Sequence, residues 1–200
     1  MVERNVIESW ISALDSADSQ VRQSAVENLR ESGAVAVEPL IITMQNQKGR
    51  KAWQAAEILS QIDDPRWVQP MKEMLTVSNT VVATAAANAL ERFGACVVDA
   101  FVEALPNCGR MAQMHMVVIL ERIGDERCVL PLMTLLQTTN SSDMQHTIIH
   151  TLGLLGDRRA IELIRPFQNH ENHHVSKRAR NALRRLEEST TISSEYDAGG

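Results

Sequence analysis

The stretch Arg178-Ala-Arg-Asn-Ala-Leu-Arg-Arg-Leu186 carries a spacing of apolar residues that recurs upstream about every 31 residues. With Leu183 as the origin, the matching positions are Leu152, Leu120, Leu90, Leu59 and Leu29. The residue four positions earlier is apolar in all six copies, and the residue three positions later is apolar in five. Apolar residues at i, i+4 and i+7 form one face of an α-helix. The sequence therefore predicts a helical repeat protein with six copies of this helix.

Each copy is preceded by another apolar stripe of helical period, so the repeating unit is a first helix, a short turn and a second helix. Glycine follows the second helix in four of the six copies, as is typical of a helix C-terminus. The first helices are predicted at residues 6–14, 35–45, 68–75, 97–105, 129–136 and 160–167. The second helices are predicted at residues 21–33, 50–61, 81–93, 111–123, 143–155 and 174–186.

Proline occupies matching places in three of the predicted first helices, at Pro39, Pro70 and Pro131. Proline inside a regular helix costs about 3 kcal/mol, because it removes a backbone hydrogen bond and crowds the preceding turn. Its recurrence at one register position therefore predicts a bend in the first helix of these repeats.

The register runs unbroken from Leu29 to Leu186, which predicts a single repeat domain over residues 1–187. After Glu188 the composition changes to Ser, Thr, Glu, Asp and Gly with no periodic apolar set. We therefore expect a disordered tail at residues 188–200.

Composition limits the classes of partner and compartment. The net charge of −5 does not favour a nucleic-acid partner, because such binding normally needs a basic surface. No N-terminal signal core is present, and no run approaches about 18 apolar residues, so no membrane partner is expected. The three cysteines form no C-x-x-C motif and indicate reduced thiols in a cytoplasmic protein. The polar residues of the first helix give no sign of self-association, so a monomer is expected.

Three segments carry a resemblance to a known family: Gln20-Val-Arg-Gln-Ser-Ala-Val-Glu-Asn-Leu29, Gly124-Asp-Glu-Arg-Cys-Val-Leu-Pro-Leu132 and Gly156-Asp-Arg-Arg-Ala-Ile161. The chain resembles HEAT-like repeats, especially the short variety of phycobilisome bilin-lyase subunits. The resemblance implies an all-α, armadillo-like fold, a right-handed α-solenoid of about six two-helix HEAT-like repeats. It also implies that a turn aspartate and an arginine at the start of the second helix link neighbouring repeats. The family includes lyase subunits, phycobilisome-degradation factors, a metal-dependent hydroxylase and plain scaffolds, so it does not fix a function.

In HEAT-like arrays the second helices line the concave side. With each repeat's leucine as origin, the positions six and two residues before it point away from the buried face. Read repeat by repeat, these outward positions are Gln23, Glu27, Trp53, Glu57, Thr84, Asn88, Met114, Val118, His146, His150, Lys177 and Asn181. From them we select a candidate partner-binding surface: Trp53, Glu57, Asn88, Met114, Val118, His146 and His150.

Trp53, Met114 and Val118 are apolar where a solvent-facing row should be polar. Tryptophan is enriched at the energetic centres of protein interfaces, so these residues favour a contact surface. The alternative is that the repeats curl enough, or the helices rotate enough, to bury them.

His146 and His150 stand four residues apart on one helix face, a spacing that can hold a divalent metal. A metal site needs a third ligand, for which Asp143 or His115 are the nearest candidates in sequence. Exposed polar histidines are the commoner explanation, so no metal is assigned.

The final predicted helix, residues 174–186, is basic. We interpret its charges as the solubilising cap of a terminal repeat; the alternative is that they bind an anionic partner.

Catalytic signatures are missing from the sequence: it has no G-x-S-x-G, no phosphate-binding glycine loop and no recognisable nucleophile with its base. We assign no catalytic residue and no cofactor. The sequence favours a non-enzymatic scaffold that binds a protein or peptide along the face formed by the second helices. The alternative is a bilin-lyase-like or phycobilisome-turnover factor acting on a tetrapyrrole-bearing protein.

Overall fold

The computed structural model describes residues 4–46 and 49–197, with side chains up to residue 188. Every regular element within these ranges is helical. The elements group into two compact units, Met1–His115 and Met116–Gly200, and the division falls inside α8 (Arg110–Ile123). The fold class is all-α, with repeated helical hairpins, as the sequence predicts. That residues 1–187 form one domain stays a prediction.

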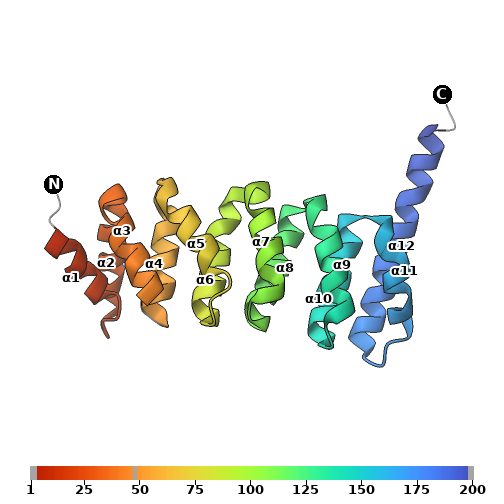
Figure 1. The fold of residues 1–200 in the computed structure, drawn as a ribbon, viewed down its shortest axis with the longest axis horizontal. Coiled ribbons are helices and arrows are strands. Elements are labelled where there is room, and N and C mark those ends of the chain that lie inside the picture. Colours follow the sequence, from red (N-terminus) through yellow and green to blue (C-terminus); the bar gives the residue numbers. More distant parts are fainter. Residues whose placement is uncertain (1–3, 47–48, 198–200) are drawn as a thin grey trace. The chain divides into compact units, whose positions relative to one another are not determined.

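Unit 1 is built of hairpins in which a first helix packs on a second (Figure 1). Its helices are α1 (Arg4–Ala13), α2 (Ser19–Glu31), α3 (Val37–Asn46), α4 (Arg50–Gln61), α5 (Val68–Met74), α6 (Thr80–Leu90), α7 (Val98–Ala104) and the start of α8. Short 3₁₀ segments join them: η1 (Gly33–Val35), η2 (Pro65–Trp67), η3 (Glu91–Val97) and η4 (Leu105–Asn107). The second helices of successive repeats also contact one another, α2 with α4 and α4 with α6.

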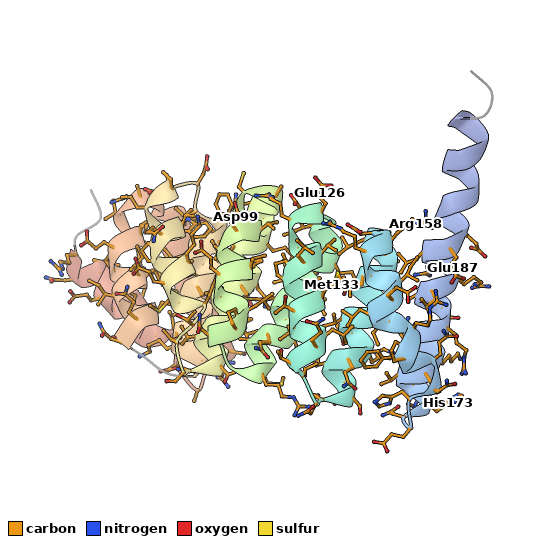
Figure 2. All side chains as sticks on the ribbon, turned by 45° about the vertical axis from the view of Figure 1, so that its right-hand side comes forward. Asp99, Glu126, Met133, Arg158, His173 and Glu187 are labelled. Carbon is orange, nitrogen blue, oxygen red and sulfur yellow. The ribbon has the colours of Figure 1, made fainter. Side chains whose placement is uncertain are left out.

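Unit 2 repeats the same plan. After the end of α8 its elements are η5 (Glu126–Cys128), α9 (Val129–Thr138), α10 (Ser142–Leu155), η6 (Arg158–Ala160), α11 (Ile161–Ile164), η7 (Arg165–Asn169) and α12 (His173–Asp197). Figure 2 shows Arg158 at the start of the last hairpin and His173 at its turn, where α12 begins. The backbone of α12 is helical past residue 187, and residues 198–200 lie outside the described part of the chain. The predicted disordered tail stays a prediction.

The leucine register is the core of both units. All six register leucines are buried, from 0% exposed for Leu29 to 4% for Leu183. The residues four positions earlier are buried in all six copies as well. Burying a leucine side chain contributes roughly 1.5–3 kcal/mol relative to leaving it exposed. The predicted buried face of the second helices is therefore confirmed at these two positions. Three residues after the leucine, Ile62 and Leu186 are buried and the other four copies are half-buried.

The repeated prolines lie in the first turns of their helices. Pro39, Pro70 and Pro131 are each the third residue of α3, α5 and α9, because a 3₁₀ turn precedes each helix and delays its start. Backbone N–H groups of the first turn have no partner within the helix, so proline sacrifices no hydrogen bond there. The predicted bend inside the first helix is thus not needed to accommodate proline.

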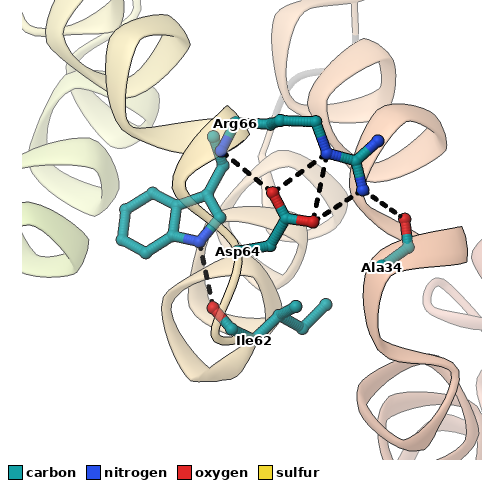
Figure 3. Close-up of polar contacts among 5 residues, drawn as sticks. Ala34, Ile62, Asp64 and Arg66 are labelled. Carbon is teal, nitrogen blue, oxygen red and sulfur yellow. Dashed lines mark hydrogen bonds and ion pairs between the residues drawn. The ribbon is translucent and has the colours of Figure 1, made fainter.

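The turn aspartates pair within their own turns (Figure 3). Asp64 accepts a hydrogen bond from the backbone N–H of Arg66 and forms an ion pair with its guanidinium, with Nη2 and Oδ2 2.6 Å apart. Arg66 Nη2 also donates to the carbonyl oxygen of Ala34, one repeat earlier, at 2.8 Å. Asp125 and Asp157 make the same contacts with Arg127 and Arg159.

These contacts correct the expected link between repeats. The expectation was that the turn aspartate and the arginine that begins the second helix link neighbouring repeats. Arg22, the arginine at that position in α2, instead donates to the backbone carbonyl oxygens of Ser16 and Ala17 in its own hairpin. In η2 the turn arginine, Arg66, contacts the preceding repeat instead. Because its guanidinium is wide and multidentate, it can hold the aspartate and a carbonyl together.

By length and composition, Thr80–Asn107 is long and apolar enough to cross a membrane, although it contains no unbroken run of about 18 apolar residues. The stretch is not one helix, because Gly94, at φ 53° and ψ −129°, separates α6 from α7. Half of its most apolar window is buried within the protein. We therefore interpret it as core of unit 1.

Gly153 provides a test of packing in unit 2. A Cβ atom at this position of α10 would lie 2.6 Å from Ala182 Cβ and 2.8 Å from Ala182 Cα on α12. Overpacking of this kind costs roughly 1–3 kcal/mol, more than the roughly 1 kcal/mol that alanine gains in helix propensity. We expect Gly153→Ala to lower the free energy of unfolding by about 1 kcal/mol in urea denaturation. Gly109→Ala is the control, because its nearest contact would be 3.7 Å away; equal midpoints for the two variants would contradict the close approach.

Candidate partner-binding surface

The outward positions of the second helices are accessible in unit 1. We call Gln23, Glu27, Trp53, Glu57, Thr84 and Asn88 the unit 1 row. Five of these six side chains are exposed, and Thr84 is half-buried. Trp53 is 41% exposed, so the alternative that helix rotation buries it is wrong. The register thus located the surface positions of α2, α4 and α6 correctly.

Three of the selected residues come together in one groove between α4 and α6. Trp53 and Glu57 line it from α4 and Asn88 lines it from α6. The remaining lining residues are Ser60, Ala85 and Ala89, and the enclosed volume is about 190 Å³. Within the described part of the chain, neither the Glu57 carboxylate nor the Asn88 amide has a hydrogen-bond or ion-pair partner. The groove therefore combines an aromatic wall with two polar groups that are free to bind.

Met114 and Val118 lie on α8. Met114 is half-buried and Val118 is 37% exposed. They fall on either side of the division between the units, Met114 in unit 1 and Val118 in unit 2. That they continue the unit 1 row as one contact stripe stays a prediction.

His146 and His150 lie half-buried on α10 and share one partner, Arg178 of α12. Arg178 Nε donates to His146 Nε2 at 3.1 Å, and Arg178 Nη1 lies 3.2 Å from His150 Nδ1. An arginine guanidinium only donates hydrogen bonds, so both facing ring nitrogens must act as acceptors. This places the proton of His146 on Nδ1 and that of His150 on Nε2. We call these three residues the Arg178 clamp.

The clamp extends to α8 through Glu121. His150 Nε2 lies 3.8 Å from Glu121 Oε1, and Glu121 Oε2 lies 2.9 Å from the hydroxyl of the buried Thr151. Polar side chains from α8, α10 and α12 are therefore connected across three successive second helices of unit 2. Since each contact is partly shielded from water, it is stronger than an exposed surface pair.

The clamp sets the charge state of its histidines. Burial lowers the pKa of His146, and the positive charge of Arg178 lowers it further. Burial and Arg178 likewise lower the pKa of His150, against an opposing contribution from Glu121. Both rings are therefore held neutral, because a proton on either would remove an acceptor from Arg178 and add a second positive charge.

The same geometry disfavours a metal at His146 and His150. His146 Nε2 and His150 Nδ1 both accept hydrogen bonds from Arg178, so the guanidinium occupies the position that a metal shared by these two nitrogens would need. A divalent ion would also lie beside the fixed charge of Arg178. In the ranges that the structure describes, no three His, Cys, Asp or Glu side chains form a group suited to a metal.

Sequence reasoning placed Lys177 on the outward row and missed Arg178. Arg178 directly follows Lys177 in the sequence, so its position on the helix points less directly outward. Its long side chain turns back toward α10. The signal available in the sequence was its spacing of 32 residues from His146, one repeat length plus one position. Spacing alone does not say whether an arginine side chain turns toward solvent or toward a neighbour.

A second groove, of about 630 Å³, was not anticipated. It lies between α1 and α3 in unit 1 and is lined mainly by apolar side chains, including Ile7, Pro39 and the exposed Ile42. Its two arginines, Arg4 and Arg66, are already paired with Glu8 and Asp64. Glu38 also lines this groove, so it presents a mainly apolar surface with one exposed carboxylate at its edge.

Comparison with known proteins agrees with this architecture. Residues 7–94 match the family model of HEAT repeats. A designed armadillo repeat protein in complex with the peptide (KR)4 superposes with a TM-score of 0.58 at 17% identity, covering 90% of this chain and 99% of that one. An engineered protein solved by a structural genomics consortium gives a TM-score of 0.57 at 20% identity, covering 91% and 98%. Residues 7–94 therefore resemble HEAT repeats in sequence, and the fold of the chain is similar to that of armadillo-type repeat proteins.

A sequence relative extends over nearly all of this chain. It is the "Uncharacterized phycocyanin operon protein Z" of Pseudanabaena tenuis (strain PCC 7409), 26% identical over 196 residues. The match covers 92% of this chain and 82% of the relative. At their low identities the two solved structures establish the shared fold alone.

We expect the Arg178 clamp to make the stability of unit 2 depend on pH. The ordinary histidine pKa of 6.5 is lowered in the folded chain, so the unfolded chain binds protons more readily. The free energy of unfolding should be highest above pH 6.5 and fall as pH decreases through the lowered pKa values. Other charges facing the two rings are Asp143, His174, Glu121 and Arg185.

The measurement is urea denaturation between pH 7.5 and pH 5. The double variant His146→Gln, His150→Gln keeps an acceptor for Arg178 but cannot titrate, so its midpoint should change less over this interval. His173→Gln, at an exposed position, is the control and should behave as wild type. If the urea midpoint of the double variant changes with pH as much as that of wild type, the pH dependence comes from other groups.

Proposed function

We propose that this protein is a non-enzymatic scaffold that binds a partner protein or peptide along the outward face of its second helices. The groove between α4 and α6 is the single observation that carries the proposal. There an exposed tryptophan stands beside an unpaired carboxylate and an unpaired amide. Most exposed side chains need no explanation, but a half-exposed tryptophan in a groove with free polar groups is typical of an interface anchor.

The fold supports the same proposal. Repeat arrays present extended surfaces built from equivalent positions of successive repeats. The designed armadillo protein of similar fold is itself in complex with a peptide. We extend peptide binding from that protein to this one as part of the proposal, with Trp53, Glu57 and Asn88 as the first contacts. Met114, Val118, His146 and His150 are proposed as further contacts along the chain.

Removal of the Trp53 side chain tests this function. Replacing a tryptophan that anchors an interface by alanine typically lowers the binding free energy by about 2 kcal/mol or more. Trp53→Ala should therefore weaken partner binding by about 30-fold or more. Partners should be captured from extract of the native source, identified, and their affinity measured with the purified proteins. Leu130→Ala is the matched control, because Leu130 is 54% exposed but lies on the first helix α9. If both variants bind the partner as wild type does, the surface is assigned wrongly.

A second candidate function follows from the sequence relative, whose name links it to a phycocyanin operon. In this alternative the scaffold acts on a tetrapyrrole-bearing protein, as a bilin-lyase-like or phycobilisome-turnover factor. Mixing the protein with phycocyanin or with a free linear tetrapyrrole should then shift the visible absorbance of the chromophore. The shift should be lost in Trp53→Ala and kept in Leu130→Ala. An unchanged spectrum at saturating concentrations would leave the general scaffold as the better description.

A further inference from the structure

We propose that the groove between α4 and α6 receives one cationic side chain, a lysine or arginine, from an extended segment of the partner. This assignment rests on the proposed function and adds to it the chemistry of the bound residue. We call this groove the Trp53 pocket; its six lining residues are those given above.

The size of the pocket selects a single side chain. Its volume is about 190 Å³, whereas pockets for small-molecule ligands usually enclose about 300–1,000 Å³. The Trp53 ring and the methyl groups of Ala85 and Ala89 form apolar walls suited to an aliphatic stem. Lysine and arginine combine such a stem with a charged end. The pocket therefore matches one long side chain better than a free metabolite.

The charge of the pocket selects a cation. Glu57 is the only charged residue among the lining residues, and its carboxylate has no partner within the described chain. An apolar occupant would take water from this carboxylate without replacing its interactions, and a neutral polar occupant would offer hydrogen bonds without a compensating charge. An anionic occupant would be repelled. A cationic occupant would pair with Glu57 and lie against the negative face of the Trp53 ring.

Arg92, which contacts a residue that lines the pocket, does not neutralise Glu57. Arg92 donates to the backbone carbonyl oxygen of Ser60, and its guanidinium carbon lies 5.8 Å from the centre of the Phe93 ring. No ion pair joins Arg92 to Glu57 in the part of the chain that the structure describes. Arg92 is thus fixed on the backbone at one end of the pocket, while Glu57 remains available.

The surroundings of the pocket are complementary to a basic segment. The unit 1 row contains two carboxylates, Glu27 and Glu57, and no lysine or arginine. Asn88 adds an amide that can donate to a peptide carbonyl and accept from a peptide N–H. An extended chain crossing α4 and α6 could therefore bind Asn88 through its backbone while one cationic side chain enters the Trp53 pocket.

The test compares two capped tripeptides, acetyl-Gly-Arg-Gly-amide and its citrulline analogue, which has nearly the same shape without the charge. Each is titrated into the full chain, and binding is followed by the NMR resonance of the Trp53 indole N–H. The Trp53→Phe variant assigns this resonance among the three tryptophans. We expect the arginine peptide to bind at least about threefold more tightly, in the range expected for a partly exposed ion pair. The difference should shrink as salt is added.

Two isosteric variants locate the charge that discriminates. Glu57→Gln should make the arginine and citrulline peptides bind alike. Glu73→Gln is the matched control, because it removes one exposed carboxylate of unit 1 on the first helix α5 and leaves the pocket intact. It should preserve the preference for arginine. Equal affinity of the two peptides for wild type, or a preference that survives Glu57→Gln, would overturn the assignment.

These results separate the inference from the proposed function. If Trp53→Ala abolishes partner binding while arginine and citrulline bind wild type alike, the surface stands and the cationic assignment fails. If the peptides discriminate as expected but Trp53→Ala leaves partner binding unchanged, the pocket is cation-selective and the proposed binding face fails.

Discussion

Burial of one leucine in each repeat is the constraint on which the rest of the structure depends. A leucine at 0–4% exposure fixes the rotation of its second helix, because turning the helix would expose that side chain and bury a polar one. Once rotation is fixed, the positions six and two residues before the leucine must face outward. The accessibility of Trp53, Glu57 and Asn88 is therefore a consequence of residues on the opposite side of their helices.

This explains how much the sequence could predict. Hydrophobic periodicity reports helix faces, so the number of second helices, most of their limits and most of the exposed row of unit 1 could be predicted. It did not show that α12 continues past residue 186 to Asp197. It does not report how a helix begins, so the 3₁₀ turns ahead of Pro39 and Pro70 could not be foreseen. It also does not report the conformation of a long flexible side chain. Arg178 turns toward two histidines because it finds acceptors there, a choice made by tertiary surroundings rather than by position in the repeat.

The same register supports different chemistry in the two units. In unit 1 the outward row leaves a carboxylate and an amide unpaired beside an aromatic ring. In unit 2 the equivalent positions of α10 carry His146 and His150, whose acceptor nitrogens are occupied by Arg178. Unpaired polar groups are available to a partner, whereas paired ones must first be released at a cost. The energetics of free and satisfied groups therefore favour unit 1 as the first point of recognition.

Function in such an array resides in positions that contribute little to stability. Side chains of the outward rows make few core contacts, so their identity can change without disturbing the leucine register. This is why similarity of fold to a designed peptide-binding protein, at 17% identity, does not transfer its ligand. The ligand has to be inferred from what the row itself offers: the size of its pocket, the sign of its charge and which of its polar groups lack partners. For this chain those three properties converge on α4 and α6, where a pocket the size of one side chain ends at a single unpaired carboxylate.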